Sequence, residues 1–257
     1  MTADAPTGVG ATALAVAGFR ALESERADRL FEDPFAADFV AAIGGTVALE
    51  PKWVGLAHHV SIRTRFFDDQ LLEAAEAGCR QVVLLAAGLD TRALRLAWPD
   101  GTTVFELDLP DVLAFKERVL AGRPPRCDRR TVVADLREDW PAALVAAGLR
   151  VDEPIAWLAE GILVYLTGDE VERLIGALRG VSPMGSRLAL AHSLRNTRGV
   201  WRSTLTEEPV GWLARHGWHG VAHDTVGLSE RYGRRVPGSG PSHAVLASAV
   251  RAQEPTG

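Results

Sequence analysis

The sequence is poor in cysteine, lysine and tyrosine, and it has neither a long apolar run nor an excess of basic charge. Its cysteines, Cys79 and Cys127, form no C-x-x-C pair, which favours a cytoplasmic protein with reduced thiols. No segment approaches the roughly 20 apolar residues that span a bilayer. No basic stretch precedes the apolar residues near the N-terminus, so we expect no signal peptide. The net charge of -5 gives no electrostatic reason to expect nucleic acid as a partner.

Metal-binding patterns are also lacking. His216, His219 and His223 have a spacing that resembles a ligand set, but they straddle glycines and have no partner cysteine. We therefore expect no metal. The arginine-rich run at 123–130 is interpreted as part of a surface connection rather than as a nucleic-acid site.

What the sequence does contain is the pattern of one α/β domain. With 257 residues, of which 47% are hydrophobic, the chain is long enough for a complete core, and we assign 1–257 to a single domain. Apolar residues three and four positions apart predict an N-terminal helical cap over 13–78. Within it, Asp33 followed by Pro34 is predicted to begin one helix. Another is predicted from near Ser61 to Gly78.

Short apolar segments then alternate with helical ones, in a βα core over 79–193. Strands are predicted at 81–86, 102–108, 130–135, 154–161 and 186–193, and helices at 89–97, 111–121, 140–147 and 167–178. This alternation predicts a parallel sheet with right-handed crossovers, covered by helices on both faces. An insert follows over 194–230. The last strand, at 242–250 within a final segment 242–251, follows a connection too short for a parallel crossover. We expect it to be an antiparallel edge strand.

The turn after the first predicted strand is the first candidate ligand site, because ligands of open α/β sheets bind beyond the carboxyl ends of strands. It runs from Ala86 through Gly88 to Asp90. Small residues allow a ligand to approach the backbone closely. However, a single glycine leaves less room than the glycine-rich fingerprint of dinucleotide sites, and Asp90 would repel phosphates. The turn therefore disfavours NAD.

Acidic residues end the next predicted strands. Asp108 could accept hydrogen bonds from both hydroxyls of a ribose, whereas Glu106 is interpreted as structural. Asp135, followed by Leu136, could bind the amino group and ring of an adenine, and Glu160 adds a further carboxylate. Each acid taken alone could instead cap the following helix. Together with Asp90 they suit a cationic adenosyl compound better than an anion, which predicts S-adenosylmethionine (SAM) as cofactor and S-adenosylhomocysteine as its product.

Five segments also resemble one known family. They are "RTRFFDD", "LLAAGLDTRALRL", "VFELDLPDVLAFK", "VVADLRE" and "LAEGILVYLT". They closely resemble, in the same order, the bacterial branch of the leucine carboxyl methyltransferase-like, SAM-dependent methyltransferases, and the resemblance runs from about Ala13 to Arg251. It implies the class I SAM-methyltransferase fold, which is Rossmann-like, with a mostly parallel seven-stranded sheet and an antiparallel last strand.

The resemblance further implies roles for single residues. One departure is Ala86, where many members have glycine and where a methyl group could narrow the turn. Arg20 corresponds only loosely to a basic residue that the family has before its first helix. By this resemblance Arg63 pairs with the SAM carboxylate, Ala86 and Gly88 line the turn, Asp108 holds the ribose, Asp135 and Leu136 hold the adenine, and Glu160 holds the methionine end.

An arginine is also expected on chemical grounds, because acidic side chains cannot bind the methionine carboxylate. Arg63 is the candidate for this contact, and Arg65 is its rival. The alternative for Arg63 is an exposed helix charge paired with Asp68 or Asp69.

Methyl transfer requires alignment of nucleophile and methyl group at about 3 Å and exclusion of water, and a base is optional. A carboxylate acceptor is ionised at neutral pH, whereas a phenol, with a pKa of about 10, gains from a base. His192 is the candidate base, with a structural role as its alternative, and Tyr165 is a candidate packing or positioning residue. In the insert, Arg195, Arg198 and Arg202 could clamp an acceptor carboxylate. The three tryptophans of the insert could line an apolar lid. Alternatively, these arginines and tryptophans could be the surface charges and packing anchors of an ordinary solvated helix.

The sequence thus predicts a cytoplasmic, SAM-dependent O-methyltransferase. Its acceptor would be a carboxylate or hydroxyl of a small molecule or peptide, bound between the helical cap and the insert. The resemblance favours a role in specialised metabolism. The alternatives are an NAD-linked oxidoreductase, and a non-methylating relative that keeps SAM or S-adenosylhomocysteine as a structural ligand or only binds another protein. The presence of both Arg63 and Asp108 counts against the latter.

Overall fold

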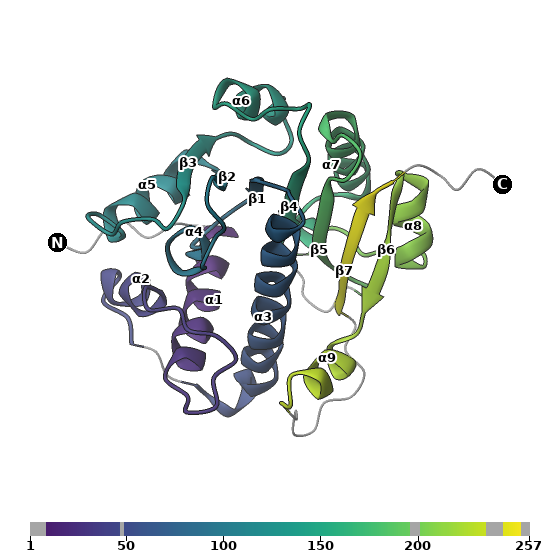
Figure 1. Ribbon diagram of the computed structural model, residues 1–257. Helices are drawn as coiled ribbons and strands as arrows, with labels where there is room; N and C mark the ends of the chain where they lie inside the picture. Colours follow the sequence, from purple (N-terminus) through teal and green to yellow (C-terminus); the bar gives the residue numbers. More distant parts are fainter. Residues whose placement is uncertain (1–8, 47–48, 196–200, 235–243, 253–257) are drawn as a thin grey trace.

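The computed structural model describes residues 9–46, 49–195, 201–234 and 244–252. Within them a seven-stranded sheet has the order β3-β2-β1-β4-β5-β7-β6, with helices on both faces (Figure 1). The predicted α/β class and the antiparallel last strand are confirmed. The strands are β1 (Gln81–Leu85), β2 (Thr103–Asp108), β3 (Asp128–Val133), β4 (Ile155–Ala159), β5 (Arg187–Ser193), β6 (Trp218–His223) and β7 (Ala244–Arg251).

The first five strands are parallel, and β1 lies between β2 and β4. The strand order therefore reverses between β1 and β4, which is the position where α/β sheets of this kind bind ligands. The connecting helices are α4 (Arg92–Arg95), α5 (Pro110–Val119), α6 (Trp140–Ala146), η2 (Leu163–Tyr165) and α7 (Gly168–Val181). Helix α4 is shorter than the helix predicted at 89–97, because residues 86–90 form a turn and the backbone becomes extended at Leu96.

The end of the chain differs from the prediction. β7 pairs antiparallel with β5 on one side and with β6 on the other. The prediction that the last strand is an edge strand is therefore wrong, since β6 forms the edge. β6 has the sequence "WHGVAH", which lacks the apolar run by which the other strands were predicted. Gly220 is required in it, because a Cβ atom there would clash with the carbonyl oxygen of Ser248.

The insert also contains α8 (Pro209–Arg215) and α9 (Thr225–Arg231). Trp212 and Trp218 are buried in the core beside the sheet, so they are packing anchors and not part of a lid. Only Trp201 of the three insert tryptophans lines the large cavity described below. Arg198 lies outside the described residues.

The N-terminal cap consists of α1 (Val9–Ser24), α2 (Ala36–Ala42), η1 (Pro51–Trp53) and the long α3 (Val54–Glu76), and α1 packs against both α2 and α3. Helix α3 begins before Ser61, because Leu56 and Val60 already continue its apolar spacing. It ends as predicted before Gly78, which has a φ of +106°. Asp33 accepts a hydrogen bond from the Phe35 N–H at 3.2 Å, and α2 begins at Ala36, the residue after Phe35.

Both faces of the sheet are covered. Val82 and Leu84 of β1 belong to the core on the face that α3 covers, together with Phe66. Val83 and Leu85 point to the opposite core, which contains Trp140 and other residues of α6 and α7. This alternation explains the continuous apolar run of the strand. None of the helices in the described segments is long and apolar enough to cross a membrane.

Candidate cofactor and acceptor site

The turn after β1 has an unusual backbone. Ala86 has a φ of +50° and Gly88 a φ of +52°, both in the left-handed region. Among the described residues other than glycine, Ala86 alone has a positive φ. The Gly88 N–H donates to Oδ2 of Asp108 at 2.6 Å, and the Ala87 N–H donates to the Leu107 carbonyl at 2.9 Å. The turn is therefore fixed to the end of β2, and its residues line a cavity.

Asp108 itself is held by backbone groups. Its Oδ1 accepts a hydrogen bond from the Leu109 N–H at 2.7 Å. Burial raises the pKa of the Asp108 carboxyl, although the two N–H donors oppose this rise. Glu106, two residues earlier, is completely buried and pairs with Lys116 and Arg129, each at 2.7 Å. Glu106 thus has the structural environment expected for it, and Asp108 faces the cavity.

A buried network of charges lies beside this turn. Arg92 is 1% exposed and contacts the carboxylates of Asp68, Asp90 and Glu160. The second oxygen of Glu160 accepts a hydrogen bond from Nε of Arg63 at 2.8 Å. Each buried charge is therefore compensated by an opposite charge, as a low-dielectric environment requires.

The network keeps its acids ionised. Burial alone would raise the pKa of Asp90, but the Arg92 guanidinium outweighs this effect and lowers the pKa to about 2. Burial likewise opposes ionisation of Glu160, yet Arg92 and Arg63 lower its pKa below the ordinary value. At neutral pH both carboxylates are negative.

The residues after β3 lie at the same edge of the sheet. Asp135 and Leu136 both line the cavity. Oδ1 of Asp135 accepts a hydrogen bond from Nε of Arg137 at 2.9 Å, and this contact lowers the pKa of Asp135. Asp135 is thus an ionised acceptor beside an apolar side chain.

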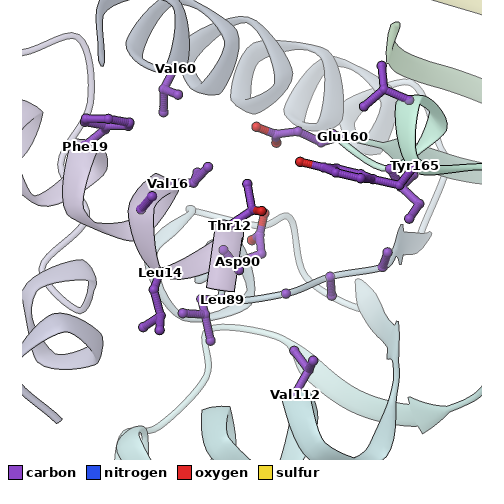
Figure 2. A pocket seen from close by; sticks show the side chains of 18 of the residues that line it. Thr12, Leu14, Val16, Phe19, Val60, Leu89, Asp90, Val112, Glu160 and Tyr165 are labelled. Carbon is purple, nitrogen blue, oxygen red and sulfur yellow. The ribbon is translucent and has the colours of Figure 1, made fainter. Parts of the chain in front are cut away.

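These elements surround one cavity of about 1100 Å³. In Figure 2, Glu160 and Tyr165 lie opposite Phe19 and Val60, with Asp90 between them. The cavity gathers every predicted cofactor residue and one of the predicted catalytic residues. Those lining it are Arg63, Ala86, Gly88, Asp90, Asp108, Asp135, Leu136, Glu160 and Tyr165.

His192 is not brought to this cavity. It is 4% exposed, its ring packs edge-on against Trp212, and its Nδ1 accepts a hydrogen bond from the Ser193 N–H at 2.8 Å. Burial lowers the pKa of His192 to about 4. The neighbouring Ser193 lines the cavity instead, because successive residues of a strand point to opposite faces. This environment matches the structural alternative for His192.

The two arginine candidates on α3 are separated clearly. Arg63 lines the cavity, and it pairs with Glu160 rather than with either aspartate considered as its alternative partner. Arg65 does not line it, since Nε of Arg65 donates to Asp69 and a terminal nitrogen to the Leu30 carbonyl, each at 2.9 Å.

Some lining residues were missed from the sequence or placed only loosely. His59 lies four residues before Arg63 on α3, a spacing that puts both on one helix face and could have identified it. Arg20 donates to the Leu89 carbonyl at 2.5 Å and pairs with Asp33 at 3.1 Å. The burial of Arg92 could not be predicted from the sequence, because the spacing of residues does not indicate which arginine three acids enclose.

The seven-stranded sheet has the fold of class I SAM methyltransferases. A DUF574-family protein from Streptomyces avermitilis superposes with a TM-score of 0.60 over 92% of this chain and 97% of its own, at 17% identity. A magnesium protoporphyrin IX methyltransferase from Synechocystis PCC 6803, solved with S-adenosylhomocysteine, gives 0.53 over 91% and 96%, at 14% identity. At these identities the likeness shows the fold.

The sequence gives the family. The profile of the leucine carboxyl methyltransferase family matches residues 13–179. A protein of Parafrankia sp. (strain EAN1pec), assigned by name to the SAM-dependent methyltransferases, is 47% identical over 95% of this chain and 88% of its own. A Streptomyces coelicolor protein with the same assignment is 42% identical over 96% of each chain. The chain belongs to the leucine carboxyl methyltransferase family, and it is a SAM-dependent methyltransferase.

Proposed function

We propose that this enzyme transfers the methyl group of SAM to a carboxylate or hydroxyl oxygen of a small molecule or peptide, in cytoplasmic specialised metabolism. One observation carries the proposal. The cavity that gathers the cofactor residues continues into a second region between α1 and α3, so that a further ligand can lie beside the cofactor. A non-methylating relative would not need that second region.

The residues present fit SAM. A carboxylate offers roughly four acceptor sites, and Asp108 uses one on each oxygen for backbone N–H groups, which leaves sites for ribose hydroxyls. Among the described residues, Arg63 donates a hydrogen bond only through its Nε, to Glu160. Its two terminal nitrogens can therefore both donate to the methionine carboxylate in a bidentate contact. Asp135 and Leu136 would hold the adenine. Asp90 and Glu160 also line the cavity, as ionised carboxylates that Arg92 and Arg63 already compensate.

When bound, SAM supplies a methyl group made electrophilic by the sulfonium. The chain orients the reactants and excludes water. Helix α1 contributes to this exclusion, because a Cβ atom built on Gly88 would lie 3.4 Å from the Cβ of Ala13. Thr12 and Leu14 of the same helix line the cavity beside this turn (Figure 2). Helix α1 thus lies directly against the turn that would hold the cofactor.

The acceptor oxygen needs positioning and, if it is a hydroxyl, a base. We assign positioning to Tyr165, whose side chain points into the cavity beside Glu160 (Figure 2). For a hydroxyl acceptor we assign the base to His59, which lines the cavity, in place of the enclosed His192. A carboxylate acceptor would need no base, and Arg202, which also lines the cavity, could then bind it.

Methyl transfer from SAM labelled in its methyl group tests the proposal. The protein would be incubated with a small-molecule extract of an actinobacterium, and the labelled products would be treated with alkali. Methyl esters release labelled methanol in alkali and methyl ethers do not, so the treatment distinguishes carboxylate from hydroxyl acceptors. Label found only on nitrogen, carbon or sulfur would overturn O-methylation.

The variant Arg202→Met separates the two acceptors further. For a carboxylate acceptor held by Arg202 we expect KM to rise roughly tenfold, the effect of losing a charge-assisted hydrogen bond. Arg195→Met is the matched control, since Arg195 is exposed and does not line the cavity.

A further inference from the structure

One end of the cavity is lined by apolar side chains of two helices. Val16, Phe19 and Leu22 of α1 line it together with Leu56 and Val60 of α3. We refer to these five residues as the α1–α3 chamber. Phe19 and Val60 point into the cavity on the side away from Glu160 and Tyr165 (Figure 2). The chamber therefore lies beyond the charged part of the cavity.

The chamber is not a continuation of the protein core. Its side chains, together with Ala57, form a hydrophobic cluster that is separate from the two cores on the faces of the sheet. Phe19 and Val60 are buried, whereas Val16, Leu22 and Leu56 are half-buried and border the cavity. Binding of an apolar ligand to a wall of this kind is favourable, because it removes apolar surface from water.

Arg20 and Glu50, two charged residues that line the cavity outside the chamber, already have partners. Arg20 lines the cavity, but its guanidinium pairs with Asp33 at 3.1 Å and donates to the Leu89 carbonyl. Glu50, at the outer part of the lining, pairs with Lys52 at 2.8 Å. The chamber itself contributes only hydrocarbon side chains. It is therefore suited to an uncharged group.

The size of the cavity leaves room for such a group. Its volume is about 1100 Å³, whereas a pocket for one drug-sized ligand has about 300–1,000 Å³. Trp53, which is 37% exposed, lines the cavity near the chamber and extends the apolar surface outward.

We infer that the methyl acceptor has an uncharged apolar body, aromatic or aliphatic, which binds in the α1–α3 chamber with its reactive oxygen toward Glu160 and Tyr165. The inference rests on the proposed function and adds the substrate class to it. A highly charged peptide or sugar acceptor does not fit this wall.

A series of 4-alkylphenols tests it. The protein saturated with S-adenosylhomocysteine would be titrated by calorimetry with phenol, 4-ethylphenol, 4-propylphenol and 4-butylphenol. We expect the affinity to rise about fourfold for each methylene, the factor for burying one CH₂ group. In Val16→Asn and in Leu56→Gln, both at half-buried positions, the gain should fall below about twofold per methylene. Val145→Asn, at an exposed position on α6, is the matched control and should keep the full gain.

The affinity for S-adenosylhomocysteine, measured alongside, shows that each variant is folded and has an intact cofactor site. Affinities for the phenols that do not depend on chain length would overturn the chamber while leaving the proposed function standing. The full gain per methylene, unchanged from the unmodified protein in both chamber variants, would also overturn it, because the alkyl chain would then bind elsewhere. Failure of the unmodified protein to bind S-adenosylhomocysteine would instead overturn the proposed function, and this inference with it.

Discussion

Ala86 is a residue whose replacement by glycine should stabilise the protein. Its φ of +50° costs an L-residue about 1–2 kcal/mol. Glycine would remove this cost, would lose about 0.5–1 kcal/mol through its greater backbone freedom in the unfolded chain, and would lose part of one methyl group's burial. The net change for Ala86→Gly is a gain of about 0.5 kcal/mol in the free energy of unfolding.

Ala87→Gly is the matched control, because Ala87 follows in the same turn with a negative φ and is buried. There the same exchange costs about 0.5–1 kcal/mol of backbone entropy and up to about 0.8 kcal/mol of burial. The two variants should differ by about 2 kcal/mol. Urea unfolding followed by tryptophan fluorescence measures this as opposite shifts of the midpoint at constant m. Equal destabilisation by both exchanges would show that Ala86 does not have the left-handed conformation.

Three further predictions concern charged side chains of the site and its surroundings. Arg92→Met should lower the free energy of unfolding by about 3–5 kcal/mol, because three carboxylates would lose their buried partner. The control Arg215→Met, at an exposed side chain, should change it by under about 0.5 kcal/mol. Burial lowers the pKa of His192 to about 4 from 6.5, so between these pH values the unfolded chain binds a proton that the folded protein does not. The free energy of unfolding should therefore fall by about 3 kcal/mol as the pH falls from 6.5 to 4. Urea unfolding at a series of pH values should show that slope, and His192→Asn should remove it without a large loss of kcat. Arg63→Lys should weaken binding of S-adenosylhomocysteine by about tenfold, since lysine lacks the forked contact, while Arg65→Lys, outside the cavity, should not; equal affinities in the two variants would contradict the assignment.

Much of the site could be predicted because it follows from position along strands. Residues at the carboxyl ends of parallel strands must meet at one edge of the sheet, so Asp108 and Glu160 could be placed from strand prediction alone. The strands themselves could be predicted from short apolar segments that end near glycine. The environment of Ala86 could not be foreseen, because a left-handed alanine is disfavoured locally and is maintained by the contacts around it.

What could not be predicted depends on burial and on side-chain direction. His192 and Ser193 are adjacent at the end of β5, and a shift of one residue decides which of them reaches the cavity. Strand β6 was missed because an edge strand needs no continuous apolar run. His59 was missed because the prediction began helix α3 near Ser61, which placed this residue in a presumed connection.

Binding of S-adenosylhomocysteine to the purified protein, measured by titration calorimetry with NAD as a competitor ligand and with Asp108→Asn as the variant, addresses the site most directly. Asn keeps the size of Asp108 but provides one fewer acceptor oxygen, at the position where the ribose hydroxyls are expected. We predict micromolar binding, no binding of NAD, and a loss of at least about tenfold in the variant. Undiminished binding in Asp108→Asn, or a preference for NAD, would contradict the assignment of this crevice.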